Sequence, residues 1–90
     1  MNIVRKRIRF YGWVQGVGFR YRAREAARLY GCSGFVRNEW DGSVLMEIQG
    51  EETAIDQVIL AVERGHFVRI ENMKVEELSV DPEERGFTED

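Results

Sequence analysis

The sequence contains little of the chemistry that metal sites and nucleophilic enzymes use. Its 90 residues include one cysteine, Cys32, and one histidine, His66. A single cysteine cannot form an internal disulfide, which fits a reducing compartment. No motif surrounds Cys32, so we expect it to be a small buried hydrophobic residue. No histidine, cysteine or carboxylate cluster has the spacing of a metal site. The sequence therefore predicts no metal, no cofactor and a surface or loop position for His66.

Long apolar runs and a strong excess of one charge are missing as well. No segment approaches the roughly 20 apolar residues that cross a bilayer, and the N-terminus has no apolar signal core. The formal net charge is only −3, which argues against binding nucleic acid by bulk electrostatics. The chain has no repeat, linker or low-complexity segment. We therefore expect one soluble, cytoplasmic, monomeric domain over residues 1–90, with neither a nucleic-acid nor a membrane partner.

Hydrophobic periodicity predicts six elements in the order strand, helix, strand, strand, helix, strand. This order is that of an α+β, ferredoxin-like βαββαβ sandwich, in which two helices cover one face of an antiparallel sheet. Many unrelated activities use this fold, so it does not define a function by itself. The predicted elements are a strand at 3–14, a helix at 19–30, strands at 34–39 and 43–49, a helix at 51–64 and a strand at 67–80.

The first predicted strand has one apolar and one basic face. Because strand side chains alternate, we expect the apolar face to be buried and the basic face to be solvated. Three arginines on one face are also compatible with a nucleic-acid patch, but a solvated outer sheet face is the favoured interpretation. The apolar set is Val4, Ile8, Phe10 and Val14, and the other set is Arg5, Arg7, Arg9 and Tyr11.

The pattern is less regular toward the C-terminus. The apolar parity slips within 67–80, which predicts a bulge or break near Glu76 and Glu77. The Asp81-Pro82 pair then ends the strand. The tail that follows is polar except for Phe87, and two outcomes stay open: Phe87 fixes a short last strand, or it hangs free.

Residues 12–20, Gly-Trp-Val-Gln-Gly-Val-Gly-Phe-Arg, join the first strand to the first helix and are called the glycine loop below. Its three glycines permit tight turns and the close approach of a ligand to the backbone. The first N–H groups of the helix have no partner within it, and the helix dipole makes this end positive. Arg20 adds a planar, always charged group at the helix start. The loop therefore predicts binding of an anion, phosphate above all.

Asn38 stands just before a predicted turn at 40–42, and two interpretations of it remain open. Asparagine is a poor strand residue, so the simpler interpretation is that it leads into the turn, whose Asp-Gly pair is typical of a hairpin. The other interpretation is that Asn38 supplies the glycine loop with a second polar side chain. Trp13, Trp40 and Tyr21 either border such a site or lie in the core or on the surface.

Two blocks of the sequence resemble the acylphosphatase family. The first block is the glycine loop with its arginine. The second is Gly34-Phe35-Val36-Arg37-Asn38 followed by Asp41-Gly42-Ser43-Val44 and Gly50. The spacing between and within the blocks matches as well, and the family's length and ferredoxin-like fold cover nearly the whole chain. Related loops also occur in the N-terminal domain of a larger hydrogenase-maturation protein, but the chain length favours the free-standing enzyme.

The departures from the family pattern all lie outside the glycine loop. Gly65 is followed by His66-Phe67, where the family commonly has Gly-Pro. Cys32 stands where a larger aliphatic residue is usual, and the last strand around Phe87 is weaker than in the family. These differences concern loop conformation and stability, and they leave the residues of the implied chemistry intact.

The resemblance implies a metal-independent hydrolase that cleaves small acyl phosphates into a carboxylate and inorganic phosphate. It implies that Arg20 and Asn38 are catalytic, Arg20 by holding the phosphate and Asn38 by orienting the attacking water. The implied phosphate-binding residues are Gln15, Gly16, Val17, Gly18, Phe19 and Arg20. From the residues alone, a non-catalytic module that binds phosphate or carboxylate is the main alternative. An RNA-binding domain is disfavoured because the predicted strand 43–49 has no stacking aromatic residue.

Overall fold

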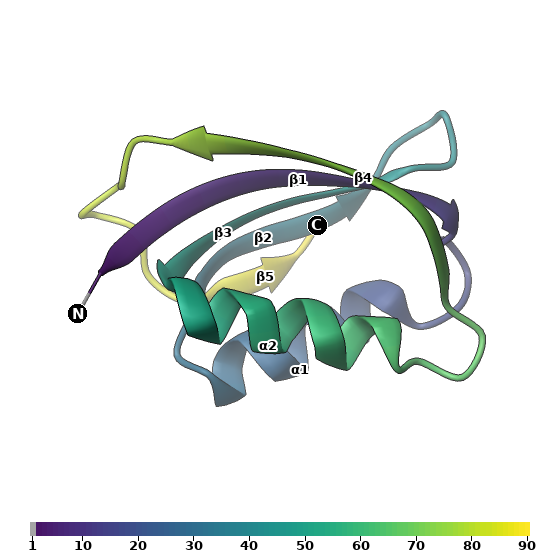
Figure 1. The fold of residues 1–90 in the computed structure, drawn as a ribbon, viewed down its shortest axis with the longest axis horizontal. Coiled ribbons are helices and arrows are strands. Elements are labelled where there is room, and N and C mark those ends of the chain that lie inside the picture. Colours follow the sequence, from purple (N-terminus) through teal and green to yellow (C-terminus); the bar gives the residue numbers. More distant parts are fainter. Residues whose placement is uncertain (1) are drawn as a thin grey trace.

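The computed structural model describes residues 2–90 as a sheet with two helices packed against one of its faces (Figure 1). Every predicted element is present, with ends within two residues of the predicted ones. The elements are β1 (Ile3–Trp13), α1 (Phe19–Leu29), β2 (Ser33–Asn38), β3 (Val44–Glu51), α2 (Glu52–Glu63), β4 (Arg69–Leu78) and β5 (Phe87–Glu89). Within residues 2–90, neither helix is both long and apolar enough to cross a bilayer.

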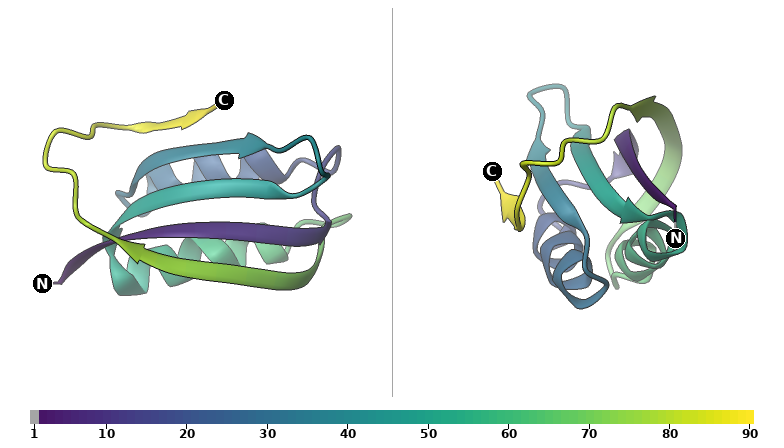
Figure 2. Two further views of the ribbon diagram at one scale, coloured as in Figure 1. Left: turned by 90° about the horizontal axis from the view of Figure 1, so that it is seen from above. Right: turned by 90° about the vertical axis from the view of Figure 1, so that its left-hand side faces the viewer.

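The sheet has the strand order β4-β1-β3-β2-β5. Strands β1 to β4 pair antiparallel, which confirms the ferredoxin-like prediction, and β5 adds a short parallel pairing to β2 at the edge. The right-hand view of Figure 2 looks along the strands and shows both helices beneath the same face. β5 decides between the two outcomes for Phe87, because its ring is 1% exposed and fixes a real last strand.

The core lies between the sheet and the two helices. The apolar face of β1 is buried as predicted, except that Val4 is only half-buried. Phe10 packs edge-on against Phe19 of α1, with 4.8 Å between the ring centroids, so β1 and the first turn of α1 are held together directly behind the glycine loop. The other core residues include Val44, Met46 and Ile48 of β3, Ala23 and Ala27 of α1, and Ile55, Val58 and Val62 of α2.

The prediction of a solvated basic face on β1 is wrong at Arg5, which is only 7% exposed. The reason is that the chain after β4 passes over this end of the sheet on its way to β5. Glu84 from that segment accepts hydrogen bonds from Arg5 (2.5 Å) and from the Ser33 hydroxyl (2.9 Å). Gln49 is tied to the main chain of Asp81 by two further bonds of 2.9 and 2.7 Å. Ion pairing thus replaces solvation at Arg5.

Glu47 makes the stability of this face depend on pH. Burial opposes ionisation of Glu47, but hydrogen bonds from Arg5 (2.9 Å) and Arg7 (3.0 Å) outweigh it, so its pKa lies below the usual value. A carboxyl group with a lowered folded-state pKa stabilises the fold above its unfolded pKa, about 4.3, and loses that contribution as the pH falls through the folded value. We therefore expect Glu47→Gln to reduce the difference in free energy of unfolding between pH 7 and pH 3.

Urea unfolding at the two pH values measures this difference. Glu77→Gln is the matched control, because Glu77 is an exposed carboxylate on β4. We expect the control to keep the pH dependence of the wild type. An identical pH dependence in wild type and Glu47→Gln would contradict the assignment of this stabilisation to Glu47.

The predicted break near Glu76 and Glu77 is wrong in its position. Both residues pair regularly with β1, and the register shifts instead where Tyr11 faces Asn72 and the next residue, Gly12, faces Ile70. Glu71 is therefore the extra, bulged residue. The apolar parity also changes between Val75 and Leu78, without a bulge. Leu78 pairs with Arg5 and so lies on the sheet face opposite the helices.

Gly34 is required where β2 begins its pairing with β5. Its φ of +138° is in the range that favours glycine, and an added Cβ would overlap the carbonyl group of Glu47 on β3. We expect Gly34→Ala to lower the free energy of unfolding by about 2–3 kcal/mol, from backbone strain and overpacking together. Gly42→Ala is the control, because Gly42 also has a positive φ but open space around it. Equal losses in the two variants, measured by urea unfolding, would contradict the steric argument.

Candidate functional site

The glycine loop turns the chain from β1 into α1 through two left-handed residues. Gly16 has a φ of +72° and Gly18 a φ of +80°, and beyond the adjacent backbone nothing lies within 4 Å of the Cβ position at either. Non-glycine residues rarely adopt this conformation. The loop therefore combines a tight turn with an uncovered backbone, which is the arrangement that lets a ligand approach main-chain N–H groups.

The N-terminus of α1 is electropositive and lacks a cap from its own sequence. Gly18 is the N-cap residue and has no side chain to bond the first N–H groups, and the first turn contains no acidic residue. These N–H groups have no acceptor within the helix, and the helix dipole adds partial positive charge to them. Arg20 lies in the same turn, so a full charge and a partial charge reinforce each other here.

A small cavity of about 130 Å³ opens beside this helix end. Five of the seven residues predicted for the site line it: Gly16, Gly18, Phe19, Arg20 and Asn38. The structure thus brings Asn38, from the end of β2, to the same cavity as Arg20 and the glycines. Gln15 and Val17 were predicted for the site, but they do not line the cavity.

Gln15 instead holds the glycine loop against the β2–β3 hairpin. Its side-chain Nε2 donates to the carbonyl oxygens of Glu39 (2.6 Å) and Ser43 (2.9 Å). The turn itself is closed by Asp41, which accepts bonds from the Ser43 hydroxyl and N–H, and these bonds lower the pKa of Asp41. Because Asn38 directly precedes this turn, the Gln15 amide links the two halves of the cavity.

Arg20 is oriented by the last residues of the chain. Its Nη1 donates to the main-chain oxygen of Asp90 at 2.8 Å, and the N–H of Asp90 donates to Val36 of β2 at 2.8 Å. The acceptor that positions this guanidinium therefore belongs to Asp90, the residue directly after the short strand β5. This acceptor is a main-chain oxygen 70 residues away from Arg20, so no residue type near Arg20 in the sequence could indicate it.

Asn38 fits both interpretations of its role. It is the last residue of β2, pairs with Val44, and leads into the turn, as the simpler interpretation has it. Its side chain is exposed and belongs to the wall of the cavity. Of the three aromatic residues considered for the site, Tyr21 lines the cavity, whereas Trp13 and Trp40 are 69% and 99% exposed and lie outside it.

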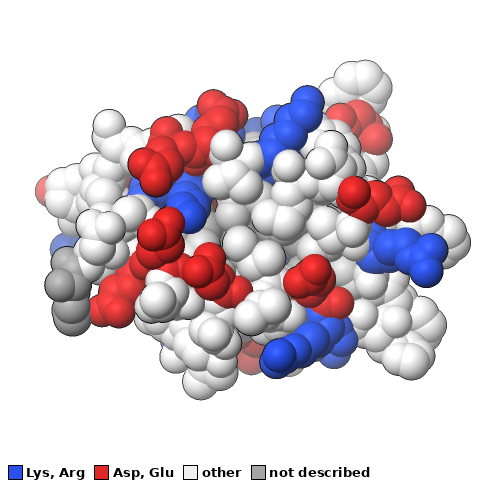
Figure 3. All heavy atoms as spheres, viewed as in Figure 1, with Lys and Arg blue, Asp and Glu red and all other residues white. Residues whose placement is uncertain are grey.

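Glu89 is a cavity residue that sequence analysis missed. Its carboxylate lies 2.8 Å from Arg24 Nη1, one helical turn beyond Arg20. Its place in the polar tail gave no signal, because β5 is only three residues long. The cavity wall therefore includes a neutralised carboxylate. Acidic and basic side chains are interspersed over the molecular face shown in Figure 3, so this face has no large area of a single charge sign.

The remaining reactive side chains lie apart from the cavity. Cys32 is 5% exposed, as predicted, and burial raises the pKa of its thiol to about 11, so it is a protonated core residue at neutral pH. His66 is exposed after α2, also as predicted, with its ring against that of Phe67. Within residues 2–90, no three His, Cys, Asp or Glu side chains are placed to hold a metal ion together.

Comparison with known proteins gives a consistent result over nearly the whole chain. The family model "Acylphosphatase" matches residues 6–89. The acylphosphatase of Oceanobacillus iheyensis is 49% identical over 78 residues, which cover 84% of this chain and 86% of that protein. The crystal structure of acylphosphatase from Bacillus subtilis superposes with a TM-score of 0.85 at 32% identity, covering 94% of this chain and 96% of that one.

The same fold also occurs as part of a much longer protein. Full-length HypF, whose crystal structure is in a phosphate- and nucleotide-bound form, matches with a TM-score of 0.82 at 28% identity. The match covers 98% of this chain but 12% of HypF. The family model and the curated relatives both match over most of the chain, and together with the superposed fold they lead to one conclusion: this chain belongs to the acylphosphatase family.

Proposed function

We propose that the chain hydrolyses the carboxyl–phosphate bond of small acyl phosphates, with Arg20 and the glycine loop holding the phosphate and Asn38 orienting the attacking water. The observation that carries the proposal is the shared cavity, because residues from the α1 N-terminus and the end of β2 meet there. Family membership supports the same reaction.

The reaction needs few catalytic groups because its leaving group is stable. An acyl phosphate releases a carboxylate, whose conjugate acid has a pKa of about 4, so no general acid is required. What the site has to supply is neutralisation of the phosphate oxygens and an aligned nucleophile. Arg20 and the first N–H groups of α1 serve the first purpose. A positioned donor of this kind is typically worth ~10²- to 10³-fold in rate.

Asn38 serves the second purpose. Its amide is not a base, but it both donates and accepts hydrogen bonds, so it holds a water molecule in line with the scissile bond. The water oxygen bonds to phosphorus while the bond from phosphorus to the acyl oxygen breaks. One water proton passes to an oxygen of the substrate's own phosphate. The products are the carboxylate and inorganic phosphate, and neither a metal nor a cofactor takes part.

The experiment that tests the proposal is hydrolysis of benzoyl phosphate by the wild-type protein with EDTA present. We expect turnover, saturation with substrate, and competitive inhibition by inorganic phosphate. The main alternative is a non-catalytic module that binds phosphate or carboxylate. A protein that binds inorganic phosphate in a calorimeter but does not accelerate hydrolysis would contradict the enzyme and support this module.

The Arg24–Glu89 pair provides a further prediction. Because Glu89 lines the cavity, loss of the Arg24 charge would leave an unneutralised carboxylate beside the bound phosphate. We expect Arg24→Gln to raise the inhibition constant of inorganic phosphate by about three- to tenfold, with a smaller effect on kcat.

The double variant Arg24→Gln/Glu89→Gln separates electrostatics from structure. Removing both charges is expected to restore the inhibition constant to within about twofold of the wild type, since the like-charge repulsion is then gone. If the double variant is as weak as the single one, the pair acts by holding β5 in place and the electrostatic explanation is wrong.

A further inference from the structure

The small cavity beside the N-terminus of α1, called the loop cavity below, has room for a phosphoryl group and little more. Its volume of about 130 Å³ is that of a few water molecules, so the acyl part of a substrate has to lie outside it. A second, larger depression of about 630 Å³ lies between α1 and α2 and is called the helix groove below. That volume is within the range of roughly 300–1,000 Å³ that small-molecule clefts show.

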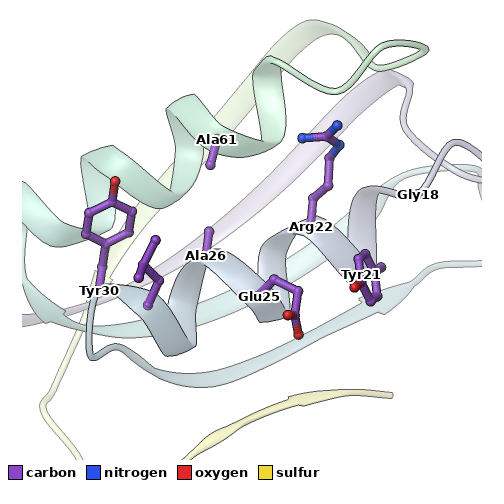
Figure 4. A pocket seen from close by; sticks show the side chains of 8 residues that line it. Gly18, Tyr21, Arg22, Glu25, Ala26, Tyr30 and Ala61 are labelled. Atoms are coloured by element: carbon purple, nitrogen blue, oxygen red, sulfur yellow. The ribbon is translucent and has the colours of Figure 1, made fainter.

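The helix groove adjoins the loop cavity at the N-terminus of α1. Gly18 and Tyr21 line both of them, so the two depressions share a wall at the N-terminus of α1. Figure 4 shows the groove extending from these two residues along α1 to Tyr30 at the far end of the helix. A third depression, of about 340 Å³ near Trp13 and Phe67, has no residue in common with the loop cavity. The groove is therefore where a group attached to the phosphate has room to extend.

The walls of the helix groove are mainly apolar. Ala26 of α1 and Ala61 of α2 are small, and they leave space between the helices (Figure 4). Leu29 and Tyr21 are 77% and 57% exposed, so they present apolar surface along the groove. Arg22 reaches from α1 toward α2, and its stem lies beside Gly65. An aliphatic or aromatic group would cover the exposed apolar side chains.

We propose that the helix groove binds the acyl group of the substrate, and that the site favours acyl phosphates whose acyl group is aliphatic or aromatic and longer than acetyl. This proposal rests on the function proposed above, because it needs phosphate in the loop cavity. Complete burial of a methylene group is worth about fourfold in affinity, and an open groove is expected to give about twofold.

Alkylphosphonates test the groove without any chemical step, because their phosphorus–carbon bond is not hydrolysed. Calorimetry would compare hexylphosphonate with methylphosphonate, which differ by five methylene groups. We expect the hexyl compound to bind wild type about 30-fold more tightly. In Tyr21→Ser, which removes an exposed apolar wall next to the loop cavity and within reach of a hexyl chain, we expect this ratio to fall by about threefold or more. Phe67→Ser is the matched control, because Phe67 is an aromatic residue with 70% exposure that lines neither the groove nor the loop cavity.

The outcomes distinguish the groove from the function. A hexyl-to-methyl ratio near one, or the same ratio in wild type and Tyr21→Ser, would overturn the groove proposal. A wild-type dimer on gel filtration that Tyr21→Ser converts to monomer would assign the groove to a second copy of the chain, and would also overturn it. If the predicted ratios hold but acetyl phosphate is not hydrolysed, the groove stands as a ligand subsite and the proposed catalysis fails.

Discussion

Replacing Arg20 by alanine is expected to lower kcat/KM for benzoyl phosphate by at least ~10³-fold. The guanidinium is the one full positive charge of the chain that lines the loop cavity, among residues 2–90. It supplies charge-assisted hydrogen bonds to phosphate oxygens, which are stronger than those of the backbone alone. The loss should appear in binding as well as in rate, because ground-state phosphate carries charge too. Inorganic phosphate is therefore expected to become a poor inhibitor.

The control for this variant is Arg28→Ala. Arg28 is an exposed arginine on the same helix and lies outside the cavity, so its removal leaves the site intact. Circular dichroism and urea unfolding would check that Arg20→Ala still folds, because the variant also loses the bond to the Asp90 main chain. A folded Arg20→Ala protein that retains more than about a tenth of wild-type activity would contradict the assigned role.

Replacing Asn38 by alanine is expected to lower kcat by ~10²- to 10³-fold while leaving phosphate binding nearly unchanged. The reason is that Asn38 is proposed to contact the attacking water and not the phosphate itself. The measurement is steady-state hydrolysis of benzoyl phosphate together with the inhibition constant of inorganic phosphate. This pattern differs from that of Arg20→Ala, in which both quantities change.

Asn72→Ala is the control for Asn38, since Asn72 is an exposed asparagine on β4. It should behave as wild type. If Asn38→Ala is folded and fully active, Asn38 only leads into the hairpin turn, and the simpler interpretation of this residue is correct. If phosphate inhibition weakens as strongly as kcat falls, Asn38 holds the phosphate and not the water.

The fold was predictable because its core follows regular periods. Ile8 and Phe10 alternate with charged residues, and the apolar stripes of both helices face them. Burial at Arg5 could not be predicted from this alternation. Alternation identifies the face on which a side chain lies, but a later segment can cover that face, and here Glu84 comes from 79 positions away. The bulge at Glu71 was misplaced for a related reason, because β4 is an edge strand whose parity is weakly constrained.

The candidate site was predictable to the extent that it is local. Gly16, Gly18 and Arg20 lie within five residues, and the strand-to-helix junction alone indicates an anion site. Asn38 needed the family resemblance, because its propensity indicates only a turn. The contacts of Arg20 with Asp90 and of Arg24 with Glu89 depend on a three-residue strand at the sheet edge. A strand of three residues is too short to show an alternating pattern in the sequence, so these long-range contacts could not be predicted.

The most direct test of the account is the fate of the oxygen atom that water supplies. Benzoyl phosphate would be hydrolysed by the wild-type protein in ¹⁸O-labelled water with EDTA present, and both products would be analysed by mass spectrometry. We expect one ¹⁸O atom in inorganic phosphate and none in benzoate, because the water oriented by Asn38 attacks phosphorus. Label in benzoate, or hydrolysis that stops when EDTA removes metal ions, would contradict it.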